Sequence, residues 1–251
     1  MTVTTSTTSD VGGATSDVGT SRRDRQRAAT EAEIKAVARR HLAAVGSDGF
    51  SLRAIARDMG MTAPGLYRYF ASLDDLRQSL CSDFFTDASD AVDDAIRAAG
   101  DDVSDRIHAA IRGFRYWAVE HPAEFRLMFQ GPDSKHEKDH APRRFAGLFL
   151  ELFMRVWAER PLDLEPGLPV PAAVCREMER FAGHIGLDLP EDAMWAFANS
   201  WIRLYGVICM EILDQLAFML DDVEPYFEAE LAAVAHGLGL DYRPDAGRRS
   251  V

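Results

Sequence analysis

The chain has 251 residues, of which 47% are hydrophobic and 27% charged, with a net charge of −12. This composition excludes a collagen-like, disulfide-stapled or wholly disordered protein, and the length suffices for one large core or two modest ones. The three cysteines are odd in number and far apart, so they predict neither a disulfide framework nor a zinc ribbon. No signal peptide or membrane span is expected, and a cytoplasmic setting is the simplest reading.

Charge is distributed unevenly along the chain. Residues 21–80 hold eleven Lys and Arg against seven Asp and Glu, whereas residues 81–251 hold seventeen against thirty-one. A small basic head joined to a large acidic body predicts two separate roles. Residues 1–21 are rich in Thr, Ser and Gly and cannot bury enough apolar surface to offset chain entropy. We therefore expect a disordered arm there, and a disordered tail over residues 241–251.

Apolar residues recur every three or four positions along most of the remaining chain, which is the period of an amphipathic helix. Ser, Thr and Asp before these runs, and Gly or Pro after them, mark helix boundaries. No stretch alternates β-branched residues over enough positions to predict a strand, so the expected fold class is all-α. The expected helices span residues 30–45, 52–59, 62–67, 72–98, 102–120, 125–129, 145–156, 171–185, 191–220 and 223–238.

The most informative segment runs from Ser51 to Phe70 and has the pattern of a helix-turn-helix. Ser51 is placed to cap its first helix, and Gly60 permits the positive φ at which that helix stops. Pro64 suits the first turn of the next helix, where a missing N–H costs little. The exposed residues of that helix are mostly short, so its backbone can approach base edges in a major groove.

This segment resembles the TetR family of bacterial repressors. The matching residues are Ile55-Ala56, Gly60-Met61-Thr62, Pro64-Gly65-Leu66-Tyr67, Tyr69-Phe70 and Ser72-Leu73-Asp74-Asp75-Leu76. Farther along, the run from Trp201 to Gly206 is similar to the Trp…His-Gly signature of one TetR C-terminal domain class, with Tyr205 in place of His. The family's usual Lys at the start of the fourth helix is Leu73 here, which removes one phosphate contact.

The resemblance implies a DNA-binding domain over residues 22–71 whose third helix reads the major groove of a palindromic operator in double-stranded DNA. Arginines of the head are substitutes for the missing Lys, namely Arg22, Arg23, Arg25, Arg27 and Arg68. We assign Leu66 and Phe70 to core packing instead. The implied DNA-contacting residues are Ser51, Arg53, Thr62, Ala63, Pro64, Gly65, Tyr67, Arg68 and Tyr69.

The resemblance also implies that residues 72–240 form a helical domain that binds a small-molecule effector and pairs two copies into a homodimer. We expect a regulator, most often a repressor, that an apolar or amphipathic effector releases from its operator, with no cofactor. Large rings and methionines can line an apolar cavity. The pocket candidates are Phe114, Trp117, Phe125, Met128, Phe149, Phe153, Met178, Phe181, Trp201 and Tyr205.

A metalloprotease-like HExxH pattern occurs at residues 136–140. That chemistry needs two His one turn apart on a buried, rigid helix. Here the segment is charged and flanked by Gly131-Pro132 and Pro142, so we interpret it as a surface loop and expect no metal site. Two alternatives to the regulator are an all-α metal-dependent enzyme that uses this segment, and a structural helix-turn-helix protein without a ligand.

Two apolar stripes on the last two helices predict the dimer interface. The alternative is that both stripes face the core of their own chain. Helix 72–98 begins against the DNA-reading helix and continues into the body, so a ligand wedged among the aromatic rings is expected to tilt it like a lever. The stripes consist of Ala198, Trp201, Tyr205, Ile208, Ile212 and Leu216, and of Phe227, Leu231, Val234 and Leu238.

Overall fold

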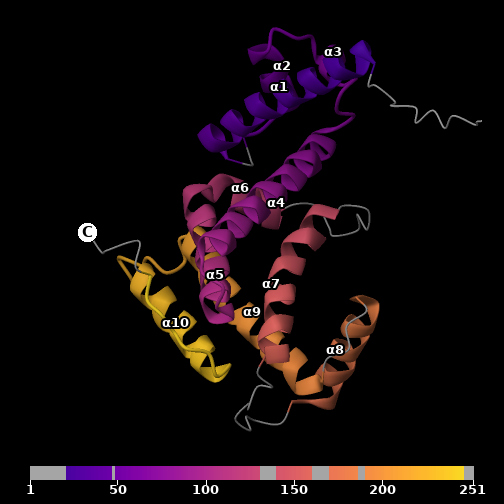
Figure 1. The fold of residues 1–251 in the computed structure, drawn as a ribbon. Coiled ribbons are helices and arrows are strands. Elements are labelled where there is room, and N and C mark those ends of the chain that lie inside the picture. The colour runs from indigo at the N-terminus through magenta and orange to yellow at the C-terminus, as the bar shows by residue number, and fades with distance from the viewer. Residues whose placement is uncertain (1–20, 47–48, 131–139, 160–169, 186–189, 246–251) are drawn as a thin grey trace, which may run out of the picture.

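The computed structural model of the protein describes residues 21–46, 49–130, 140–159, 170–185 and 190–245. These ranges contain helices and no strand, so the expected all-α fold class is confirmed. The first three helices form a small head at one end of a larger helical body (Figure 1). The helices are α1 (Arg22–Val45), α2 (Leu52–Asp58), α3 (Ala63–Leu66), α4 (Leu73–Ala98), α5 (Val103–Glu120), α6 (Pro122–Gln130), α7 (His140–Glu159), α8 (Ala172–Ile185), α9 (Glu191–Ile212) and α10 (Glu224–Gly237).

The head has a small core of its own. Ile34 and Leu42 of α1 pack against Ile55 and Leu66, and all four side chains are at most 1% exposed. The helix α1 begins eight residues earlier than expected, because Ser21 and Asp24 form a capping box at its start. The first turns of α1 therefore belong to the folded head.

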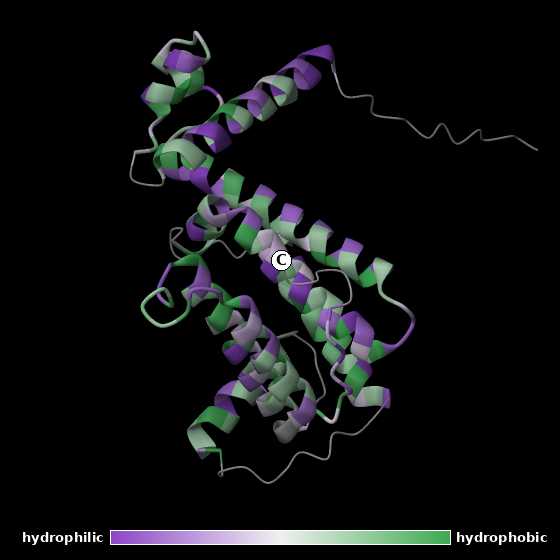
Figure 2. Ribbon diagram, turned by 90° about the vertical axis from the view of Figure 1, so that its left-hand side faces the viewer, coloured by the Kyte–Doolittle hydropathy of each residue, from purple (hydrophilic) through white to green (hydrophobic). Residues whose placement is uncertain are grey.

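The helix α4 joins the head to the body. It begins at the head, with Ser72 as its N-cap, and runs down into the body, where it packs against α5, α6 and α7 (Figure 1). Leu80, Phe84 and Ala88 on its inner face are fully buried. Along each body helix the colouring of Figure 2 alternates between hydrophobic and hydrophilic residues, as expected of helices with one buried face.

Two features of the C-terminal part differ from expectation. The helix α9 ends at Ile212 rather than near residue 220, because Asp214 adopts a positive φ of 58° two residues later. Residues 241–245, expected within a disordered tail, lie against α5 and α10, since the Tyr116 hydroxyl of α5 donates to Asp245 at 2.7 Å and the Tyr242 hydroxyl donates to Glu228 of α10 at 2.6 Å. Residues 1–20 and 246–251 lie outside the described ranges.

Candidate nucleic-acid interface and effector pocket

The helix-turn-helix is built by side chains that bond to their own backbone. Ser51 accepts a hydrogen bond from the Ala54 N–H at 3.3 Å and Thr62 accepts one from the Gly65 N–H at 3.2 Å, which caps both helices. Gly60 adopts the expected positive φ, at 63°, where the first helix stops. These local bonds fix where α2 and α3 begin.

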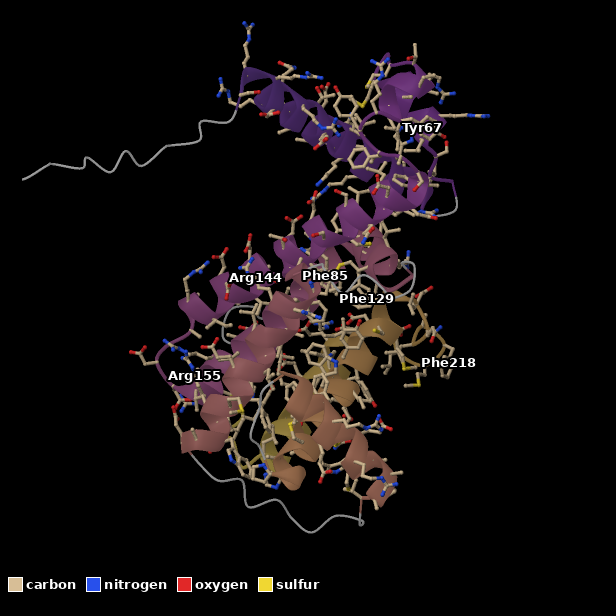
Figure 3. All side chains as sticks on the ribbon, turned by 90° about the vertical axis from the view of Figure 1, so that its right-hand side faces the viewer. Tyr67, Phe85, Phe129, Arg144, Arg155 and Phe218 are labelled. Carbon is tan, nitrogen blue, oxygen red and sulfur yellow. The ribbon has the colours of Figure 1, made fainter. Side chains whose placement is uncertain are left out.

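The predicted DNA-contacting residues all lie in α2, in α3 or in the residues that flank these two helices. Figure 3 places Tyr67 at the end of the molecule farthest from the body. Tyr67 is 48% exposed, while Leu66 and Phe70, at 0% and 6%, anchor the segment to the core as assigned. Side chains fall into two groups by exposure. The exposed group consists of Arg53, Thr62, Pro64, Tyr67 and Arg68. The half-buried group consists of Ser51, Ala63, Gly65 and Tyr69.

The DNA-reading helix itself is short. The helix α3 covers four residues and continues as a turn, with the Phe70 N–H donating to the Leu66 carbonyl at 3.2 Å. Gly65 has a structural reason beside its predicted role, because a Cβ there would lie 3.1 Å from Oγ1 of Thr62 and crowd the cap.

Ion pairs attach α1 to α4. Lys35 lies 2.9 Å from Asp83, and Arg39 lies 2.8 Å from Asp87 with its guanidinium 4.7 Å above the Phe84 ring. These contacts span the junction between head and body. They join the middle of α1 to the first half of α4.

The body contains a small, partly open apolar cavity of about 60 Å³, formed by α5, α7, α9 and α10. Aromatic rings make up much of its wall. Trp201 and Tyr205 on α9 are stacked at 11° with their centroids 5.5 Å apart, and Phe114 on α5 stacks on Tyr205 at 7° and 6.2 Å. Phe149 and Phe153 on α7 complete the ring-lined side.

Half of the predicted pocket residues line this cavity, namely Phe114, Phe149, Phe153, Trp201 and Tyr205. Phe125 belongs to the same ring cluster, 6.0 Å from Phe114, but Trp117 stacks on His121 instead, and Phe181 is 50% exposed on α8. Met128 and Met178 also lie outside the wall. The other residues that line the cavity were not predicted as pocket residues, although they continue the same helical stripes. They are Ile107, Ile111, Phe197, Ser200, Leu204, Ile208, Val234 and Leu238.

The polar groups of the cavity wall already have partners. The Ser200 hydroxyl donates to the Ala196 carbonyl at 2.7 Å, and the Tyr205 hydroxyl pairs with Cys209. Burial raises the pKa of Tyr205, so its phenol is neutral. Since none of the described side chains that line the cavity is charged, its chemistry favours an uncharged, apolar occupant.

Both predicted dimerisation stripes face the core of their own chain, so that interface assignment is wrong in detail. Ile208, Ile212, Phe227 and Leu231 are at most 5% exposed in the single chain. These stripes are buried within the single chain because their side chains pack with the aromatic rings of α5 and α7. The opposite face of α9 is the exposed one.

Buried ion pairs hold α5 to α9 and α10. The Arg115 side chain, 4% exposed, lies 2.6 Å from Glu211 and also pairs with Glu224. Arg112 binds Glu228 with two nitrogens, at 2.8 and 2.6 Å. Although burial opposes the charge, the hydrogen bonds of Glu211 and Glu224 raise the pKa of Arg115.

A second cavity, of about 440 Å³, lies between the end of α4, α5 and residues 243–245. His108 on its wall is 2% exposed, and its Nδ1 donates to the Ser104 carbonyl at 2.5 Å. Its Nε2 has no hydrogen-bond partner among the described residues. Burial lowers the pKa of His108, so the ring is neutral at pH 7.

The structure bears on the expected absence of a metal site and of a membrane span only for the residues that it describes. Residues 136–139 of the HExxH pattern lie outside the described residues. Within the described ranges, no group of three or more His, Cys, Asp or Glu side chains is arranged to hold a metal ion. None of the helices in the same ranges is long and apolar enough to cross a membrane.

Two family models match the chain. One, described as bacterial regulatory proteins of the tetR family, matches residues 34–80, which contain the helix-turn-helix. The other, described as a tetracyclin repressor-like C-terminal domain, matches residues 107–234, which contain the ring-lined cavity. The head is therefore matched by the family's N-terminal domain model, and the body by a C-terminal domain model of the same family.

Curated relatives are similar over most of the chain. The HTH-type transcriptional regulators Rv1816 of Mycobacterium tuberculosis (strain H37Rv) and Mb1846 of Mycobacterium bovis are each 32% identical over 213 residues, covering 80% of this chain and 88% of theirs. A solved structure of a regulatory protein, SCO4313, is 26% identical, with a TM-score of 0.65 over 86% of this chain and 100% of its own. A protein of unknown function from Rhodococcus sp. RHA1 shares the fold, at 19% identity, with a TM-score of 0.61 over 83% of this chain and 94% of its own. The chain is a member of the TetR family of bacterial transcriptional regulators, which are DNA-binding proteins and not enzymes.

Proposed function

We propose that this protein binds a palindromic operator as a homodimer, acts as a cytoplasmic repressor, and is released by a small uncharged apolar effector. One observation carries the proposal: an exposed helix-turn-helix is attached by ion pairs to α4, and α4 packs on two walls of a ring-lined cavity. DNA binding, dimerisation and effector release follow from three different surfaces. Each has its own test.

DNA reading is assigned to α3 and its flanks. Tyr67 is expected to contact phosphate, so Tyr67→Ala should weaken binding to operator and to random duplex DNA about equally. Tyr67→Phe keeps the ring and separates the hydroxyl from the packing. Ala63→Ser should instead change which sequences are selected from a random pool, because α3 reads base edges. Unchanged affinity in Tyr67→Ala together with unchanged preference in Ala63→Ser would contradict this placement of α3.

Dimerisation is assigned to the outward face of α9 and α10. Exposed apolar residues recur along one side of α9 and its C-cap, separated by about two and three helical turns: Trp195 is 37% exposed, Ile202 68% and the C-cap Leu213 42%. Tyr226 on α10, at 39%, extends this face, and the ion pair of Arg203 with Glu230, at 2.6 Å, joins the two helices. Two such faces related by a two-fold axis would form a four-helix bundle.

Gly206 gives this interface a clean test. It lies on the outward stripe of α9, and a Cβ there would meet nothing within 4 Å in the single chain. Gly206→Leu should therefore fold normally but hold two copies apart. Gly147 on α7 also has open space around its Cβ, so Gly147→Leu is the matched control. We expect a monomer for Gly206→Leu and a dimer for the control by analytical ultracentrifugation; a dimer in both would contradict the interface.

The effector is assigned to the ring-lined cavity. A volume of about 60 Å³ holds roughly two waters, whereas ligand pockets usually measure ~300–1,000 Å³. A drug-sized ligand must therefore push the rings of α5, α7 and α9 apart. No residue of α4 lines the cavity, so the expected lever action reaches α4 through α5 and α7, which both pack against it.

An uncharged fluorescent aromatic, N-phenyl-1-naphthylamine, can test the pocket directly. Ile111→Phe should fill the cavity and weaken binding of this dye at least ~10-fold, which corresponds to about 1.4 kcal/mol. Phe181→Leu changes an exposed ring on α8 and serves as the control, with unchanged affinity. Equal dye binding by Ile111→Phe and wild type would exclude this cavity. Absence of any saturable ligand would favour the ligand-free structural protein instead.

A further inference from the structure

The helix α1 extends beyond the part of the head that the family model covers. The model begins at residue 34, whereas α1 begins twelve residues earlier, at Arg22. Its first turn is held by a reciprocal pair of bonds: the Asp24 N–H donates to Oγ of Ser21, and the Ser21 N–H donates to the Asp24 carboxylate, both at 3.2 Å. The extension is thus a helix with a defined direction.

This extension is strongly basic. Four arginines within six residues, Arg22, Arg23, Arg25 and Arg27, are all exposed, and the same stretch contains one acid, Asp24, whose carboxylate serves the cap. The body has the opposite charge, so the basic extension stands out against its surroundings. Charge of this sign on a rigid helix attracts phosphate.

One contact places the extension beside the DNA-reading segment. The Arg27 guanidinium lies 5.3 Å from the centroid of the Tyr69 ring, and Tyr69 follows α3 directly. In Figure 3 the start of α1 and Tyr67 both lie in the head, away from the body, and on opposite sides of the head in that view. From Arg27 to Arg22 the helix advances about 7.5 Å, the rise of roughly two base pairs of DNA.

We propose that the first turns of α1 form an additional DNA-contact site, in which Arg22, Arg23 and Arg25 bind backbone phosphates flanking the half-site read by α3. The proposal rests on the DNA-binding function proposed above. Each phosphate contact releases condensed counterions and adds ~0.9 to the slope of log affinity against log salt. Three arginines in each of two protomers would contribute up to ~5 units of slope.

The test uses a 40-base-pair duplex of arbitrary sequence, because phosphate contacts do not need an operator. Fluorescence anisotropy gives the affinity of the full-length protein at several salt concentrations. The variant Arg22→Gln/Arg23→Gln/Arg25→Gln keeps good helix formers in α1. Its matched control, Arg155→Gln/Arg176→Gln/Arg180→Gln, removes the same charge from exposed positions on α7 and α8.

We expect the α1 variant to lose ~3–5 units of slope, while the control variant keeps the wild-type slope. A third variant with Lys at the same three α1 positions retains the charge and should retain most of the slope. An α1 Gln variant with the wild-type slope would overturn the proposal, as would a Lys variant that loses as much as the Gln variant. Failure of the wild-type protein to bind any duplex would instead overturn the proposed function itself.

Discussion

Polar side chains serve the head and the body in different ways. In the helix-turn-helix they bond three residues away, as Ser51 does with the Ala54 N–H and Thr62 with the Gly65 N–H. In the body, Arg112 reaches Glu228 across 116 positions and Arg115 reaches Glu211 across 96. The two helices of the helix-turn-helix are thus capped by local bonds, whereas the body is closed by charges that meet only after the chain has folded.

Because of this difference, we expect a lost polar contact to cost the helix-turn-helix and the body different amounts of folding stability. A local cap can be lost without disturbing distant helices, so the DNA-reading segment can vary while the body stays intact. A buried ion pair leaves an unpaired charge when one partner is removed, so its loss spreads over every helix that it joins. The predictions below test that contrast, from the largest effect to the smallest.

The largest loss of stability is expected for Arg115→Met. It leaves Glu211 and Glu224 facing a buried site without their cation, which costs ~3–5 kcal/mol. Arg155→Met is the control, because its pair with Glu151 is exposed and contributes only ~0.3–0.5 kcal/mol. Urea unfolding at one fixed protein concentration measures both. Losses of similar size would remove the contrast between buried and surface charges.

The pH dependence of body stability is expected to come partly from His108. Burial lowers its pKa, so the unfolded chain takes up the proton at higher pH than the folded one. The stability is therefore complete above pH ~6.5 and declines as the pH falls below that value, by at most ~1.4 kcal/mol per pH unit. His108→Gln cannot titrate and should flatten the unfolding free energy between pH 7.5 and 5.5.

Exposed His236 on α10 provides the control for that experiment. His236→Gln should keep the wild-type slope of unfolding free energy against pH. A His108→Gln protein as pH-sensitive as wild type would show that the buried ring does not set this slope.

The smallest effect is expected at the cap of α4. Ser72 accepts a bond from the Asp75 N–H at 3.0 Å, so Ser72→Ala should cost ~1 kcal/mol. Ser72→Gly should cost only a few tenths, because glycine tolerates the cap position. Thermal and urea unfolding of the two variants distinguish the values. An equal loss in both would point to packing instead of capping.

The contrast between local and long-range contacts also explains which features could be predicted from the sequence. The roles of Gly60 and Ser51 could be predicted because they depend on neighbours three or four residues away. The pairing of Arg115 with Glu211 has no local signal, since either residue alone resembles solvated surface charge. For that reason the packing of residues 241–245 on α5 was also missed.

The sequence predicted that aromatic residues of the body would line a cavity, but it did not predict which of them do. Trp201 and Trp117 share helical spacing and size, yet Trp201 lines the cavity and Trp117 stacks on His121. The dimer stripes failed for a related reason. Periodicity showed that one side of α9 is apolar, whereas its other side, with Ile202 and Leu213, is apolar as well and is the exposed one. Only the packing of α5 and α7 decides which side is inward.

The central claim is that the cavity of the body and the DNA face of the head are linked. The most direct test titrates wild-type protein with N-phenyl-1-naphthylamine, with and without a saturating operator selected from random duplexes, in one buffer at one salt concentration. If the dye favours an arrangement of α4 that the operator does not, operator must weaken dye binding, by a factor typically ~5–150. The account predicts such a weakening, and the same factor when operator is titrated in the presence of dye. Equal dye affinities in the two titrations would contradict it.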